Sequence, residues 1–156
     1  MTSTTGPVTT MTAAARPVEW VIRAVVVAGL VVDAYVHFDL AENQQLAAPG
    51  GIGGGTLFRL QAAVATVVAL LLLLSGRRWA YALAFVAGLS ALVPVLLYTY
   101  VDVPAIGPIP SMYDPTWYSE KVLSVVAEAV VVVLSVAGWS VSGRIRRNTA
   151  VVAPRS

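Results

Sequence analysis

Four long apolar runs constrain this chain more than any other feature of its sequence. They cover residues 18–40, 57–74, 79–100 and 118–141. At about 1.5 Å of rise per helical residue, such runs match the roughly 30 Å hydrocarbon core of a bilayer. Only 12% of the residues are charged, whereas soluble domains carry about 25%. The sequence therefore predicts an all-α integral membrane protein, a four-helix bundle formed by residues 16–143.

The two ends of the chain are expected to lie outside this bundle. Residues 1–15 are rich in Thr, Ala and Ser and show no apolar period, which predicts a disordered tail. Arg16 and Pro17 end this tail, and Pro17 suits the first turn of the helix that follows. Residues 144–156 contain the sequence RIRR and are expected to form a basic tail.

The arginines predict how the chain is oriented in the membrane. With four spans, one side collects Arg16, Arg77, Arg78, Arg144, Arg146 and Arg147. The loops of the other side contain acidic residues and no Lys or Arg outside the helix ends. Because cytoplasmic segments carry the excess of Lys and Arg, we expect both termini in the cytoplasm and a multi-pass protein of a bacterial plasma membrane.

Several classes of chemistry are disfavoured by what the sequence lacks. Without any cysteine, disulfides, thiol relays, iron–sulfur clusters and cysteine zinc sites are excluded. The net charge of +2 and the short basic clusters argue against nucleic-acid binding. The glycine-rich segment PGGIGGG has no preceding strand and no GK[ST] ending, so a membrane-surface connector is favoured over a phosphate-binding loop. No known catalytic motif is present, which favours a non-enzymatic role without deciding it.

Polar residues within the spans gather in the halves predicted to face outward. The candidate ligand-binding residues are Asp33, His37, Arg59, Gln61, Tyr98, Lys121 and Glu128. Asp33 and His37 are four residues apart and so share one helix face. A charge at mid-span costs about 2.5–3.5 kcal/mol, so Asp33 and Glu128 should face inward.

We predict that these residues form one polar pocket that opens outward. Arg59, Lys121 and His37 are the expected partners of the two carboxylates, and the proline-rich loop of residues 101–117 is expected to roof the pocket. Met112, Tyr113 and Trp117 are candidates for part of this lid. The inner half of the bundle is expected to be nearly free of polar groups apart from Arg23.

These polar groups support more than one interpretation. They could be buried ion pairs that only fix helix register, a binding site for a small ligand or cofactor, or a catalytic site. His37, the only histidine, could be hydrogen-bonded to Asp33 or to a loop carbonyl, or could accept a proton or form a hydrogen bond with a quinone. It could also complete a metal site with Asp33 and Glu128. No HxxxH or ExxH pair supports that last option, so no metal is predicted.

The layout of the chain resembles a known group of bacterial membrane proteins. Its length, four spans, cytoplasmic termini and polar outer end of the first helix resemble the DoxX-like group. The stretches LVVDAYVHFDLA and LYTYVDVPAIGPIPSMYDP are similar to a family of uncharacterised actinobacterial four-span membrane proteins. Because some DoxX-like proteins accompany quinone-dependent redox enzymes, the resemblance implies a quinone as the candidate cofactor.

The sequence therefore favours a redox-accessory subunit, or one that binds a small lipophilic molecule such as a quinone. The alternatives are a structural subunit or assembly factor of a larger membrane complex, and a small oligomeric transporter. The bilayer is the expected partner, together with other membrane subunits or further copies of the chain.

Overall fold

Four helices joined by three connections make up the fold. A computed structural model describes residues 8–152, with side chains described for residues 16–144. The helices are α1 (Val8–Ala47), α2 (Gly54–Ser75), α3 (Arg78–Tyr100) and α4 (Ser119–Val152). Each contains a segment long and apolar enough to cross a membrane. The predicted all-α four-helix bundle is confirmed, and the chain is a small multi-pass integral membrane protein.

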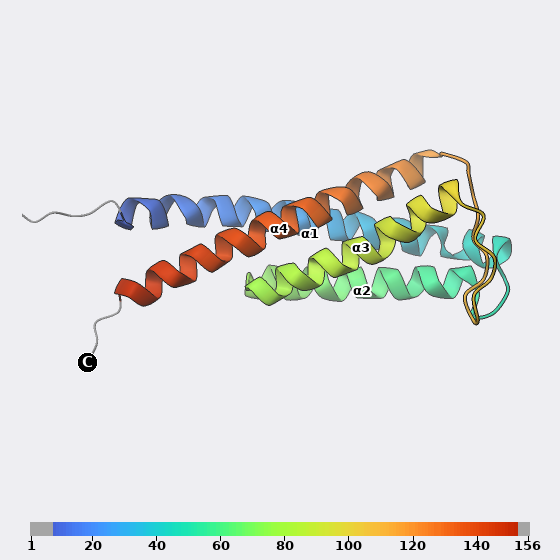
Figure 1. Ribbon diagram of the computed structural model, residues 1–156, viewed down its shortest axis with the longest axis horizontal. Coiled ribbons are helices and arrows are strands. Elements are labelled where there is room, and N and C mark those ends of the chain that lie inside the picture. The colour runs from blue at the N-terminus through green and yellow to red at the C-terminus, as the bar shows by residue number, and fades with distance from the viewer. Residues whose placement is uncertain (1–7, 153–156) are drawn as a thin grey trace, which may run out of the picture.

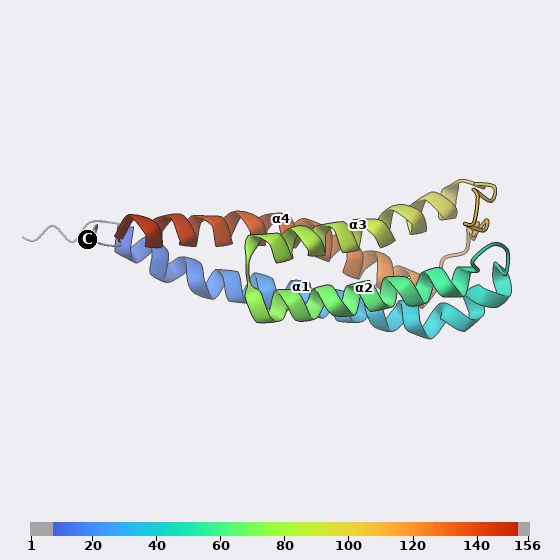
Figure 2. The ribbon, with the colours of Figure 1, turned by 90° about the horizontal axis from the view of Figure 1, so that it is seen from below.

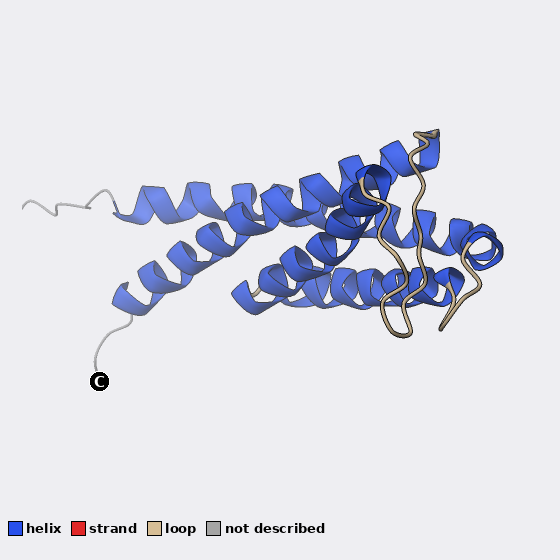
Figure 3. Cartoon of the chain, turned by 45° about the vertical axis from the view of Figure 1, so that its right-hand side comes forward, coloured by secondary structure: helices blue, strands red, loops and turns tan. Residues whose placement is uncertain are grey.

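The helices pack in a ring, in which consecutive helices are in contact and α4 closes the ring against α1. α1 contacts α2 and α4, α3 contacts α2 and α4, and α1 and α3 barely touch. α1 begins and α4 ends at the same end of the bundle, which we call the terminal end (Figure 1). The two longer connections, residues 48–53 and 101–118, lie at the opposite end, which we call the loop end (Figure 3).

α1 and α4 are longer than the sequence predicted. Residues 8–15, expected to belong to a disordered tail, are helical, and Pro17 lies inside α1 rather than in its first turn. α4 continues to Val152, so most of the expected basic tail is helical too. Extending an existing helix fixes one residue per added hydrogen bond, and alanine favours it. Residues 1–7 and 153–156 of the expected tails lie outside the described residues.

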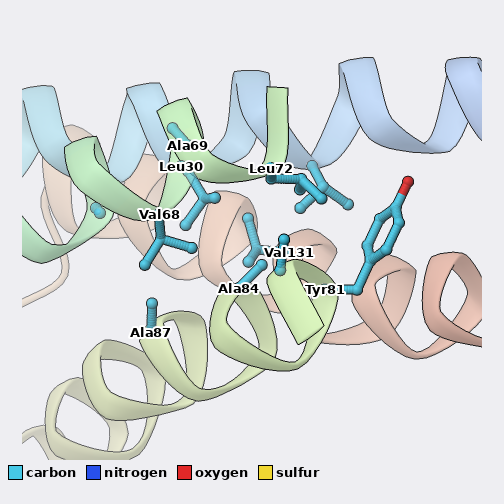
Figure 4. Packing of buried hydrophobic residues seen from close by; sticks show 11 residues of the cluster. Leu30, Val68, Ala69, Leu72, Tyr81, Ala84, Ala87 and Val131 are labelled. Atoms are coloured by element: carbon cyan, nitrogen blue, oxygen red, sulfur yellow. The ribbon is translucent and has the colours of Figure 1, made fainter. Parts of the chain in front are cut away.

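Small residues bring the helices close together in the core. Ala62, Ala65 and Ala69 of α2 and Ala84, Gly88 and Ala91 of α3 are all buried. A Cβ atom added at Gly29 or Gly88 would lie within 3.0 Å of the Val131 side chain. Figure 4 shows how Leu30, Leu72 and Val131 fill the space between these small faces. Membrane helices associate through such close packing because, in lipid, burying apolar side chains between helices gains no hydrophobic free energy.

The glycine-rich connection lets α1 and α2 approach each other at the loop end. Gly53 has a φ of 80° directly before α2, a conformation that suits glycine. A Cβ atom at Gly54 would lie 2.7 Å from the carbonyl oxygen of Gln44, and one at Gly55 would collide with the carbonyl of Ala41. The expected membrane-surface connector is therefore shorter than predicted, because α1 runs on to Ala47.

α2 and α3 separate toward the loop end. They are joined by a tight turn at Gly76, whose φ of 53° ends α2, and they diverge from there in both views (Figures 1 and 2). Pro94 lies inside α3, where it cannot donate the helical hydrogen bond to Ser90. The divergence leaves room between the two helices for the cavity described next.

Candidate functional site

A cavity of about 490 Å³ occupies the loop-end half of the bundle. This volume falls within the range of about 300–1,000 Å³ that is typical of small-molecule sites. Side chains from all four helices and from the 101–118 connection line it. Leu60 and Val64 of α2 and Val93 and Leu97 of α3 are lining residues that the bundle also leaves exposed. The cavity therefore opens sideways between α2 and α3, on a surface suited to lipid.

A buried acidic cluster closes the inner end of this cavity. One ring nitrogen of His37 and one carboxylate oxygen each of Asp33 and Glu128 lie within 4.8 Å of one another. Asp33 and Glu128 are each only 1% exposed. The predicted convergence of the first and fourth spans is therefore present in the structure. We call these three residues the acidic cluster.

The hydrogen bonds of Asp33 leave one of its oxygens without a hydrogen-bond donor. Gln61 Nε2 donates to Asp33 Oδ2 at 3.0 Å and also to the Ala87 carbonyl at 3.1 Å. His37 Nδ1 donates to the Asp33 carbonyl at 3.0 Å and lies 2.8 Å from Asp33 Oδ1. Because that N–H is directed at the carbonyl, Oδ1 has the ring nearby but accepts no hydrogen bond. The expected pairing of His37 with Asp33 is present.

Glu128 has still fewer partners. Ser124, one turn earlier on α4, donates to Glu128 Oε1, while Oε2 is buried without a partner. An unpaired buried carboxylate oxygen is costly because it has lost its hydration. The acidic cluster thus contains two carboxyl groups and only one basic group, His37.

Lys121, an expected partner of these carboxylates, instead holds the loop. Its Nζ donates to the Asp114 carbonyl at 2.5 Å and to the Thr116 carbonyl at 3.1 Å, and lies 3.6 Å from Asp114 Oδ2. The loop is also tied to α3, since Asp114 N donates to the Tyr98 carbonyl at 3.0 Å. Lys121 still lines the cavity, so it belongs to the site as an anchor of the roof.

The roof matches the prediction in part. Ile109 and Met112 of the 101–118 connection line the cavity. Tyr113 and Trp117 are exposed, and Trp117 packs near Tyr100 with ring centroids 6.4 Å apart. Only Met112 of the three proposed lid residues therefore faces the cavity.

One predicted site residue is not part of the site. Arg59 is exposed and does not line the cavity, whereas Gln61, two residues later, does. Two positions on a helix differ by about 200° in direction, so both could not face inward. Tyr98 lines the cavity as predicted, beside Tyr118. Burial, together with the carboxylates of Asp114 and Glu120, raises the pKa of the Tyr118 phenol, which keeps it protonated as a hydrogen-bond donor.

A second buried polar cluster lies at the terminal end, where sequence analysis expected Arg23 almost alone. Arg23 donates to both carboxylate oxygens of Glu19 at 2.8 Å, and the Tyr81 hydroxyl donates to Glu19 Oε1 at 2.8 Å. Figure 4 shows the Tyr81 ring reaching from α3 toward α1. The spacing of Glu19 and Arg23 could have predicted their pairing, but nothing in the sequence linked Tyr81 to them. We call these residues the terminal-end network.

Comparison of the chain with protein-family models, curated proteins and solved structures gives no match. The functional argument therefore depends on the geometry of the chain itself.

Proposed function

We propose that this chain is a membrane subunit that binds a small lipophilic molecule with a hydrogen-bonding head, of the quinone class, in the cavity between α2 and α3. One observation carries the proposal. The cavity opens through exposed apolar side chains of membrane-spanning helices and ends on buried polar ones. That combination suits a molecule that enters sideways from the bilayer, tail outward and head inward.

The polar groups that line the cavity suit a head that carries carbonyl or hydroxyl oxygens. Ser90, Tyr98 and Tyr118 supply hydroxyls to the lining, and Glu128 supplies an acceptor. The His37 ring lies on the lining beside Phe58, with centroids 4.9 Å apart. Imidazole titrates near neutral pH, so it can exchange a proton with a quinol hydroxyl. A bound quinone would make the chain a redox-accessory subunit.

The two alternative roles fit the described residues less well. A purely structural subunit has no need of a cavity of this size. A transporter requires a polar path between the two ends. Among the side chains described, the core between the cavity and the terminal-end network is filled by Leu30, Leu72, Val131 and their apolar neighbours, with Ser135 as a buried polar exception.

Orientation is a further part of the proposal. The arginine distribution supports cytoplasmic termini, which puts the cavity in the outer half of the bilayer. A cysteine introduced at the exposed Ser111 should react with a membrane-impermeant thiol reagent added to intact cells. Since the chain has no other cysteine, labelling of Ser111→Cys only after the cells are opened would contradict this orientation.

The binding proposal is tested with a matched pair of variants on one face of α3. Val93 lines the cavity, whereas Val86, two turns earlier, does not, and both are more than half exposed. Val93→Trp should fill the cavity mouth, while Val86→Trp should only add an aromatic ring at the lipid surface. Decyl benzoquinone should raise the thermal unfolding midpoint of the wild type and of Val86→Trp but leave that of Val93→Trp unchanged.

A second ligand separates recognition of the head from recognition of the tail. Decanol carries the same alkyl chain without the quinone head and should shift the wild-type midpoint less. Equal shifts with both ligands would show that only the tail is bound, and equal shifts in both tryptophan variants would show that the molecule binds elsewhere. Either result would contradict the proposal.

A further inference from the structure

The acidic cluster has more carboxyl groups than basic groups, an excess that the lipophilic ligand does not explain. Two carboxyl groups, Asp33 and Glu128, are buried beside one imidazole. The nearest other basic side chain of the cavity, Lys121, is bound to the loop by Asp114 and Thr116. Arg23 is paired with Glu19 at the terminal end. A cation from outside the chain would balance the cluster.

Two buried oxygens are available to hold such a cation. Glu128 Oε2 has no hydrogen-bond partner, and Asp33 Oδ1 accepts no hydrogen bond although His37 Nδ1 lies 2.8 Å away; both side chains are 99% buried. In native proteins nearly all buried polar atoms are satisfied, and an exception is expected to have a reason. Four side-chain atoms of the described residues are such exceptions, and two of them belong to the same three-residue cluster; the other two, Arg78 Nε and Ser135 Oγ, lie apart from it.

From this geometry we infer that Asp33, His37 and Glu128 bind one divalent first-row transition-metal ion. One imidazole and two carboxylates form a donor set that suits zinc, manganese or ferrous iron. Calcium prefers six to eight oxygen ligands, and copper(I) prefers sulfur. The donor set therefore selects against both.

The distances allow the site to close around an ion. Two ligand atoms bound at about 2.0–2.2 Å at a tetrahedral angle lie about 3.3–3.6 Å apart, and the three ligand atoms lie within 4.8 Å of one another. A change of side-chain rotamer at Glu128, held only by Ser124, would bring its carboxylate closer by the ångström or so that remains.

The surroundings also resemble those of a metal site. The Gln61 amide orients Asp33, and Gln61 is itself held because its Oε1 accepts a hydrogen bond from Ser90 at 3.2 Å. Such outer hydrogen bonds fix the ligands of metal sites. His37 and Glu128 both line the cavity, so an open coordination position of the ion would face the cavity.

The inference is tested with the full-length chain in detergent, first treated with chelator and then titrated with Zn²⁺, Mn²⁺ or Co²⁺ alone. We expect one ion per chain, and for Co²⁺ a visible absorption band from ligated metal. His37→Gln and Glu128→Gln should each weaken binding by more than about 100-fold, since each removes a ligand. Gln61→Ala, which removes only an orienting contact, should weaken it by about 10–100-fold.

Two controls make the result decisive. Glu42→Gln removes an exposed carboxylate of α1 and should leave binding unchanged. Glu128→Asp keeps a carboxylate and should retain part of the affinity, which distinguishes loss of a ligand from loss of the fold. A wild-type chain that binds no ion at micromolar concentration, or that binds it as tightly as Glu128→Gln, would overturn the inference.

The metal and the lipophilic ligand can be tested separately. Val93→Trp blocks the cavity mouth but leaves the three ligands in place, so it should lose decyl benzoquinone and keep the metal. Failure of either binding event therefore does not decide the other.

Discussion

The two buried polar clusters of this bundle differ in how well their charges are matched. In the terminal-end network, the Glu19 carboxylate accepts hydrogen bonds from Arg23 and from the Tyr81 hydroxyl. The acidic cluster at the loop end has two carboxyl groups, Asp33 and Glu128, each with an oxygen that accepts no hydrogen bond, and only His37 to pair with them. The first cluster is complete within the chain, and the second is not.

This difference separates a structural role from a binding role. Buried charges that satisfy one another fix the positions of helices and need no ligand. Buried charges left unsatisfied cost free energy, and in a membrane span such groups are functional candidates by default. A cavity lies beside each cluster, of about 490 Å³ at the acidic cluster and about 370 Å³ at the terminal-end network, so the unsatisfied carboxylate oxygens are what distinguish the two. We therefore assign structure to the terminal-end network and binding to the acidic cluster.

The largest effect on stability is expected in the terminal-end network. Glu19→Gln leaves the Arg23 guanidinium buried without its counter-charge, and breaking a buried pair in this way typically costs about 3–5 kcal/mol. Unfolding of the purified chain in mixed micelles with increasing dodecyl sulfate measures the loss. The double variant Glu19→Gln/Arg23→Met should recover part of it, and a single-variant loss below about 1 kcal/mol would remove the contrast between the clusters.

A smaller loss of stability is expected when a glycine of α4 is substituted at the same end of the bundle, and two glycines there can be compared. A Cβ atom at Gly138 would collide with the Tyr81 ring, whereas one at Gly143 would meet only the flexible Arg78 side chain, at 3.0 Å. Overpacking typically costs about 1–3 kcal/mol. Gly138→Ala should therefore be clearly less stable than Gly143→Ala in the same unfolding assay, and equal losses would argue against tight packing around Tyr81.

In the acidic cluster, neutral substitutions should cost less than Glu19→Gln. In metal-free buffer, Glu128→Gln removes a charge that the chain does not balance, so its stability should stay within about 1 kcal/mol of wild type or rise. Asp33→Asn should cost more, since it changes the acceptor of the Gln61 hydrogen bond. The double variant should deviate from additivity by more than about 0.5 kcal/mol, because neighbouring groups couple. Additive effects would mean that the two carboxyl groups act independently.

The smallest effect is expected at Arg59. It is exposed and outside the cavity, and surface substitutions usually change stability by less than about 0.5 kcal/mol. Arg59→Gln should therefore leave both stability and the decyl benzoquinone shift unchanged. If decyl benzoquinone no longer raised the unfolding midpoint of Arg59→Gln, Arg59 would have to be part of the binding site.

The fold could be predicted because each apolar run corresponds to one membrane span, and the bilayer core requires such a span to be helical. Helix ends were less predictable. Residues 8–15 carry no apolar period, yet they extend α1, since alanine-rich sequence prolongs a helix without needing a buried face. The signals for helix ends in the sequence were Pro17 and the composition of the tail, and neither stops a helix that has already formed.

Within the site, the sequence predicted contacts between residues of one helix better than contacts between different helices. Asp33 and His37 were placed together by their separation of four residues, and Glu128 by its depth. Lys121 and Arg59 were assigned to the carboxylates by charge alone. Their true positions depend on the rotation of α2 and on loop carbonyls that Lys121 binds. Tyr81 was missed for the same reason, because its contact with Glu19 depends on how α3 faces α1.

The central claim is that the loop end binds and the terminal end holds the bundle together. Native mass spectrometry of the full-length chain with added decyl benzoquinone tests it most directly, by comparing wild type, Glu19→Gln and Val93→Trp. We predict the ligand mass on wild type and on the folded fraction of Glu19→Gln, and its absence from Val93→Trp. Ligand retained by Val93→Trp, or lost from folded Glu19→Gln, would contradict the account.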